Sequence, residues 1–147
     1  MIAALRGAVF EAIKREEENF KMFQRLADEA KDDKLKEFLL LMAEDTKKDI
    51  KMLKNLNLRS IMKFGLRFKF EAPKIEIDES TVRAIKDVAG AKEILKIAID
   101  QLNVNIEYFE HIADHSFFPE VKRLLRIIAD KELEDKSRLK ALFDLIS

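Results

Sequence analysis

Four long stretches of this chain carry apolar residues at the three- and four-residue spacing of a helix that buries one face. They span residues 2–30, 34–56, 91–115 and about 117–147. Only three glycines and two prolines occur among 147 residues, so little interrupts these helices. The spacing predicts long amphipathic helices that pack together, because each must bury its apolar stripe against a neighbour.

Capping residues mark where these helices begin. Asp32 precedes the second helix and can accept hydrogen bonds from the free N–H groups of its first turn. Ser116 is the predicted cap of the fourth helix, where Pro119 and Glu120 suit the first turn. The turns within each pair of helices are short, so each pair is expected to form an antiparallel hairpin.

Residues 58–90 connect the two hairpins and differ from them in composition. Pro73 ends any regular structure in the first part, and a short helix is expected to begin near Asp78 and to stop at Gly90. Basic and aromatic side chains alternate in the first part: Arg59, Lys63, Phe64, Arg67, Phe68, Lys69, Phe70 and Lys74. Such a crossover is expected to lay its aromatic side chains over the bundle or a partner subunit, with its charges solvated.

The charge of the chain is balanced, with 28 basic and 28 acidic residues. No overall charge attracts nucleic acid or a membrane surface, so neither is an expected partner. Cysteine is absent, which excludes disulfides, thiol catalysis and cysteine-bound metal. No apolar run approaches the roughly 20 residues of a membrane span, and the N-terminus lacks a signal-peptide pattern. We therefore expect a soluble, cytoplasmic protein, with a charge content that resembles thermophilic proteins.

Each long helix is expected to bury one apolar stripe, called its seam here, and polar residues interrupt these seams near their middle. In the fourth helix, Glu132 and Asp135 are three residues apart and therefore lie on the apolar face. The seam of the first helix contains Glu16, and that of the second contains Thr46 and Asp49. A buried carboxylate is costly unless a metal ion, another cation, a proton or water compensates it. These positions are therefore the candidate functional site.

The two hairpins resemble each other. A shift of 86 residues aligns 12–56 with 98–142 without a gap. Identical residues at aligned positions include Ala12/Ala98, Asn19/Asn105, Phe23/Phe109, Ala27/Ala113, Leu39/Leu125, Asp49/Asp135 and Leu53/Leu139. The sequence therefore predicts an all-α protein, an antiparallel four-helix bundle made from a duplicated helical hairpin. The expected boundaries are one domain over 1–147, hairpins at 2–57 and 91–147, and a crossover with a short helix at 58–90.

These hairpins are similar to those of the rubrerythrin-like branch of the ferritin superfamily. The segments that carry the resemblance are Ala12–Glu16, Met22–Ala27 and Leu41–Asp49 in the first hairpin, and Ala98–Leu102, Tyr108–Ala113 and Ile128–Asp135 in the second. In that family each hairpin supplies one glutamate and one Glu-x-x-His pair, and the six side chains hold two irons. The resemblance implies a ferritin-like bundle and redox chemistry on peroxide or oxygen.

Two of the six family ligands are kept in this chain. Glu16 matches a first-helix glutamate, and Glu132 matches one of the bridging glutamates. The other four positions are changed: Thr46 replaces the second bridging glutamate, Leu102 replaces the third-helix glutamate, and Asp49 and Asp135 replace the two histidines. Leucine cannot bind a metal, and carboxylate oxygens suit harder cations than imidazole does.

Three functions remain open. The first is a non-catalytic binding or structural module whose di-iron site has been lost. The second is a metalloprotein with one divalent cation (Fe, Mn or Mg) in a carboxylate-only site formed by Glu16, Asp49, Glu132 and Asp135. The third is a di-iron oxidoreductase acting on peroxide or oxygen, as the resemblance implies. The replaced ligands favour the first, with no metal bound.

Two further features concern partners. His111 and His115, four residues apart and outside the motif positions, could bind a metal at the surface. Their polar neighbours favour solvated histidines instead. The apolar side chains of the crossover, together with the family resemblance, predict a homodimer.

Overall fold

The structure is a computed structural model that describes residues 1–147 and contains six helices and no strand. The four long helices are α1 (Ile2–Glu29), α2 (Asp33–Lys54), α5 (Ala91–His115) and α6 (Pro119–Ile146). Two short helices, α3 (Leu58–Phe64) and α4 (Glu79–Ile85), belong to the connection between the hairpins. The predicted all-α architecture is confirmed.

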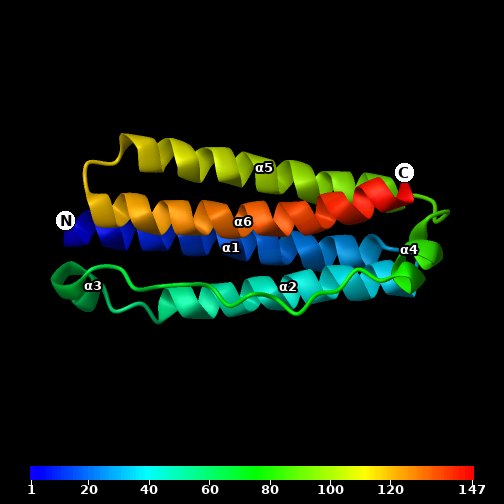
Figure 1. The fold of residues 1–147 in the computed structure, drawn as a ribbon, viewed down its shortest axis with the longest axis horizontal. Helices are drawn as coiled ribbons and strands as arrows, with labels where there is room; N and C mark the ends of the chain where they lie inside the picture. The colour runs from blue at the N-terminus through cyan, green and yellow to red at the C-terminus, as the bar shows by residue number, and fades with distance from the viewer.

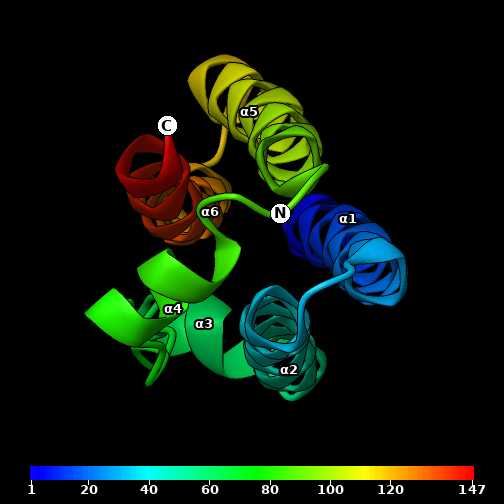
Figure 2. The same cartoon turned by 90° about the vertical axis from the view of Figure 1, so that its right-hand side faces the viewer.

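The four long helices lie side by side as a bundle (Figure 1). Viewed along its axis, the α1–α2 hairpin faces the α5–α6 hairpin, and the short helices cover the side between α2 and α6 (Figure 2). The crossover runs the whole length of the bundle, from α3 at one end to α4 at the other (Figure 1). The crossover thus ends at the end of the bundle where α5 begins.

The helix boundaries follow local capping chemistry. Asp32 accepts hydrogen bonds from the N–H groups of Lys34 and Leu35 at 2.8 and 3.2 Å, as predicted. The predicted cap at Ser116 is wrong, because Ser116 follows α5 and Phe118 is the residue that precedes α6. Proline favours the first position of a helix, so Pro119 moves the start of α6 beyond the reach of Ser116.

The basic and aromatic part of the crossover begins with a helix that the sequence analysis did not assign. Asn57 caps α3 by accepting a hydrogen bond from the N–H of Ser60 at 3.0 Å, and Gly65 ends it with φ +85°. The following extended segment is fixed to α6, because Leu66 N–H donates to Glu120 Oε2 at 2.9 Å. Phe70 is buried against the bundle, whereas Phe64 is 62% exposed, so only part of the aromatic set covers the bundle.

The hydrophobic core consists of two clusters along the bundle axis. One contains Phe23, Leu39 and Leu95, and the other contains Leu5, Phe109 and Leu124. Full burial of one such side chain contributes roughly 1.5–3 kcal/mol to folding. Between the two clusters, every long helix has at least one buried polar residue, and these residues together are called the polar layer below. Ile50 and Ile106 are the buried apolar residues at this level. The core thus has apolar ends and a charged middle.

No helix combines the length and the hydropathy that crossing a membrane requires.

Candidate functional site

Nine buried polar side chains form the polar layer at the middle of the bundle. They are Glu16, Asn19, Asp45, Thr46, Asp49, Asn105, Lys131, Glu132 and Asp135. All four long helices contribute, because each places a polar residue in its otherwise apolar seam. The layer divides into an aspartate–lysine group and a glutamate–asparagine group.

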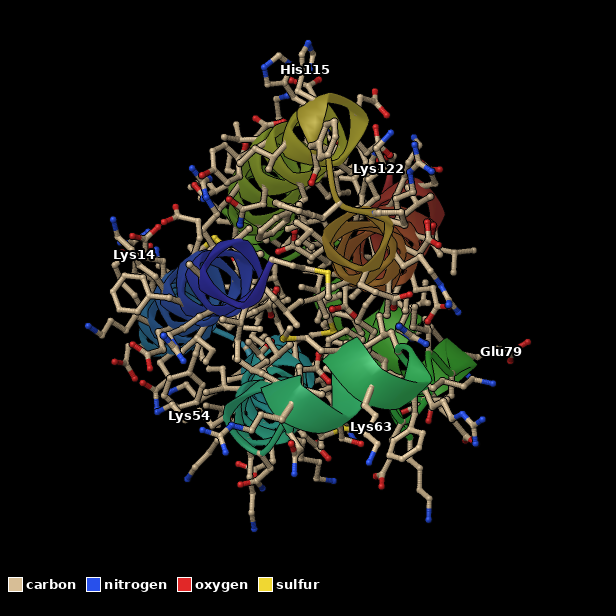
Figure 3. The ribbon with its side chains drawn as sticks, turned by 90° about the vertical axis from the view of Figure 1, so that its left-hand side faces the viewer. Lys14, Lys54, Lys63, Glu79, His115 and Lys122 are labelled. Atoms are coloured by element: carbon tan, nitrogen blue, oxygen red, sulfur yellow. The ribbon has the colours of Figure 1, made fainter.

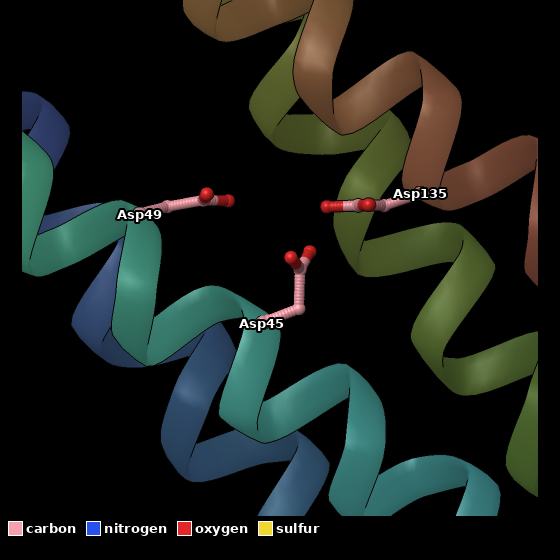
Figure 4. A group of neighbouring side chains, drawn as sticks. All are labelled: Asp45, Asp49 and Asp135. Atoms are coloured by element: carbon pink, nitrogen blue, oxygen red, sulfur yellow. The ribbon is translucent and has the colours of Figure 1, made fainter. Parts of the chain in front are cut away.

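In the aspartate–lysine group, three carboxylates surround one ammonium. Asp45 and Asp49 on α2 and Asp135 on α6 point into a common space, with one oxygen of each within 4.8 Å of the others (Figure 4). Lys131 fills that space from α6. Its Nζ lies 2.6 Å from Asp45 Oδ2, 2.8 Å from Asp49 Oδ2 and 3.3 Å from Asp135 Oδ1. An internal cation therefore occupies the position that the carboxylates would offer to a metal.

Neighbouring charges keep Lys131 protonated. Burial by itself would lower the pKa of Lys131, but the negative charges of Asp135 and Asp49 and the hydrogen bond to Asp45 raise it above its ordinary value. Arg138 adds a second cation, with Nη1 3.1 Å from Asp135 Oδ1. Burial raises the pKa of Asp49 to about 7 and that of Asp135 to about 6, because the nearby Lys131 only partly offsets desolvation.

In the glutamate–asparagine group, the orientation of two amides follows from Arg15. The Arg15 guanidinium can only donate, so the oxygen of Asn105 must face it, and Nη1 lies 3.0 Å from that Oδ1. The Asn105 amide nitrogen then points inward and donates to Asn19 Oδ1 at 2.8 Å and to Glu132 Oε1 at 3.3 Å. Asn19 in turn donates to Glu132 Oε1. Two amide donors therefore favour a negative charge on Glu132.

The second oxygen of Glu132 has no partner. Glu132 Oε2 is buried and receives no hydrogen bond. Glu16 and Glu132 are neighbouring buried carboxyl groups, and a negative charge on one disfavours a negative charge on the other. Burial and the charges of Glu132 and Asp49 raise the pKa of Glu16 well above its ordinary value, which favours a protonated Glu16. Burial raises the pKa of Glu132 itself to about 7.

Arg15 should matter to the stability of this group although it lies at the edge of the layer. Arg15→Leu removes the charged donor of Asn105 Oδ1, and we expect the free energy of unfolding to fall by about 1.5–3 kcal/mol. Urea unfolding measures this change. Arg25→Leu is the matched control, because Arg25 is exposed on the same helix, and it should stay within about 0.5 kcal/mol of the wild type. Equal effects of the two substitutions would contradict the network.

The structure buries all of the site residues predicted from the sequence, but not as one constellation. Glu16 and Glu132 form one pair, and Asp49 and Asp135 belong to the lysine group. The hydroxyl of Thr46 donates to the Met42 carbonyl of its own helix at 2.9 Å. Leu102 places a buried apolar side chain, 1% exposed, at the position of a lost ligand.

Lys131 and Asp45 are central residues that were not predicted from the sequence. Both lie beside the seams rather than in them, and the default expectation for lysine is exposure to solvent. One signal was present. Under the 86-residue shift, Asp45 aligns with Lys131, so residues of opposite charge occupy equivalent positions next to the predicted ligands. Their ion pair joins the two hairpins directly.

Comparison with known proteins gives one match. The family model described as Rubrerythrin matches residues 9–143, which include most of both hairpins and the whole crossover. The chain belongs to the rubrerythrin family. The resemblance predicted from the two hairpins is therefore confirmed. Comparisons of this rubrerythrin-family chain with curated proteins and with solved structures gave no significant match.

Proposed function

We propose that this rubrerythrin-family bundle holds no di-iron centre and serves as a non-catalytic binding or structural module. The observation that carries the proposal is the ammonium of Lys131, placed at hydrogen-bonding distance from Asp45, Asp49 and Asp135. A divalent cation in that space would meet a positive charge at contact distance. Repulsion at such a distance in a buried site disfavours metal binding.

The remaining ligand positions support the same proposal. Leu102 offers no donor atom, and the Thr46 hydroxyl is engaged with a backbone carbonyl. The raised pKa values of Glu16 and Glu132 favour protonation of this pair, which reduces the negative charge that would otherwise attract a cation. The donor set therefore does not fit two irons. Lys131 and protonation of the Glu16–Glu132 pair together neutralise the negative charge that bound metal neutralises elsewhere in the family.

A second candidate is a single divalent cation, Fe, Mn or Mg, held by Glu16, Asp49, Glu132 and Asp135. The unpaired Oε2 of Glu132 favours it, because a buried oxygen without a partner is an available ligand. This alternative requires Lys131 to leave the carboxylates and Glu16 to lose its proton. Both changes oppose the electrostatics of the layer, so we rank it second.

Metal analysis separates the two candidates. The test protein is His111→Ala/His115→Ala, which removes the only imidazoles of the chain, so that any retained metal must be held by oxygen ligands. Purified without chelators, it should contain no stoichiometric Fe, Mn or Mg, and adding Glu132→Ala should not change its metal content. Stoichiometric metal that disappears with Glu132→Ala would overturn the proposal in favour of the second candidate.

We also propose that the bundle arose by duplication of one hairpin and forms a homodimer. The duplication is supported by interactions between positions 86 residues apart, Asn19 with Asn105 and Asp45 with Lys131. The dimer is supported by large apolar side chains left exposed, among them Phe10 at 68% and Val104 at 56%. Light scattering that gives the mass of one chain would contradict the dimer.

A further inference from the structure

A histidine pair lies at the end of α5, remote from the polar layer. His111 and His115 are one helical turn apart, with ring centroids 4.3 Å from each other. Both side chains line an open cavity of about 530 Å³, together with Glu11, Tyr108 and Ser116. Figure 3 shows His115 at the periphery of this end of the bundle. The pair is therefore open to solvent and to small solutes.

One hydrogen bond fixes the state of the His115 ring. Its Nδ1 lies 2.8 Å from the backbone carbonyl oxygen of His111. A carbonyl oxygen only accepts, so Nδ1 carries the proton, and Nε2 of the neutral ring presents a free lone pair. Histidines that bind metals commonly donate the other ring N–H to a carbonyl or carboxylate in this way. His115 is thus oriented as a ligand before any metal arrives.

We propose that His111 and His115 form a binding site for a borderline transition-metal ion such as Zn²⁺, Ni²⁺ or Cu²⁺. Two histidines four residues apart on one helix face can reach the same ion, and imidazole suits these metals. Glu11 lines the same cavity from α1, where its carboxylate is paired with Arg15 at 3.3 Å. Water completes the coordination shell. The site uses none of the residues of the polar layer and does not depend on the proposed function.

Copper binding tests the site with little ambiguity. The chain has two histidines and no cysteine, so hyperfine coupling to imidazole nitrogens in the electron paramagnetic resonance spectrum of added Cu²⁺ reports on this pair. We expect one equivalent of Cu²⁺ with coupling from two imidazole nitrogens. His111→Ala and His115→Ala should each weaken binding by at least about tenfold, because each removes half of the protein ligands.

The control is Asp114→Asn, which neutralises a charge on the same turn of α5. Asp114 pairs with Arg126 at 3.2 Å and does not line the cavity, so this variant should bind Cu²⁺ like the wild type. All the exchanged side chains are exposed, and circular dichroism should show an unchanged helix content. Wild-type binding in either histidine variant, or a spectrum without imidazole nitrogens, would overturn the proposal.

Discussion

Replacement of Lys131 by methionine should lower the free energy of unfolding by about 3–5 kcal/mol at pH 7.5, the cost of removing one partner from a buried ion pair. Methionine keeps most of the volume of the side chain but leaves Asp45 and Asp49 buried without their cation. Desolvated carboxylates at this separation repel each other and hold charge only at high cost. Urea unfolding followed by circular dichroism measures the loss.

Two comparisons make this result specific. Lys140→Met removes a lysine on the same helix whose partner, Asp144, is exposed, and its effect should stay below about 1 kcal/mol. At pH 5 the deficit of Lys131→Met should shrink, because protonation removes the charge that the lysine compensated. A deficit equal to that of the control would show that Lys131 does not neutralise the aspartates, and the proposed function would lose its main support.

Stability should decrease as the pH rises from about 4.5 to about 7, which is the reverse of ordinary acid denaturation. Burial raises the pKa of Glu132 from 4.5 to about 7, that of Asp49 from 3.8 to about 7 and that of Asp135 from 3.8 to about 6, so in this range the folded chain binds protons that the unfolded chain releases. Stability falls with pH wherever the folded state holds more protons. The shift of Glu132 alone corresponds to about 3 kcal/mol. The pKa of Lys131 is also raised, but lysine is a base, so its contribution to stability is lost only when it deprotonates at alkaline pH.

Glu16→Gln tests the origin of this slope. A glutamine amide can donate to Glu132 without a proton, so the variant should have a flatter profile and should match or exceed the stability of the wild type at pH 7.5. Glu18→Gln, at an exposed position of the same helix, should leave the profile unchanged. Denaturant midpoints at closely spaced pH values provide the measurement. An unaltered slope in Glu16→Gln would mean that the proton is not held by the Glu16–Glu132 pair.

Most of the fold could be predicted because it depends on local patterns. Apolar spacing placed the long helices, and Asp32 and Asp78 begin helices where their side chains accept hydrogen bonds from free N–H groups. The start of α6 was misplaced because two capping signals compete within four residues, and the backbone of Pro119 prevails over the side chain of Ser116. The path of the crossover depends on distant contacts such as Leu66 with Glu120, which no local pattern encodes.

The candidate site could be predicted only in part. Helical periodicity identified Glu16, Asp49, Glu132 and Asp135 as buried, and their need for compensation followed from the cost of burying charge. The identity of the compensating group did not follow. Lysine has a long, flexible side chain that can reach a seam from a flanking position, so the burial of Lys131 depends on where Asp45 lies on the opposite hairpin.

The polar layer also determines how the hairpins align along the bundle axis. Leucine pairs tolerate sliding, since one apolar contact can replace another at similar cost. A slip of one helical turn between the hairpins, about 5.4 Å, would instead place the charge of Lys131 against an apolar cluster and leave Asp45 and Asp49 buried without their cation. A buried polar group that penalises every other alignment is a known means of selecting one register. In this bundle, the charged middle selects a single register for two otherwise similar hairpins.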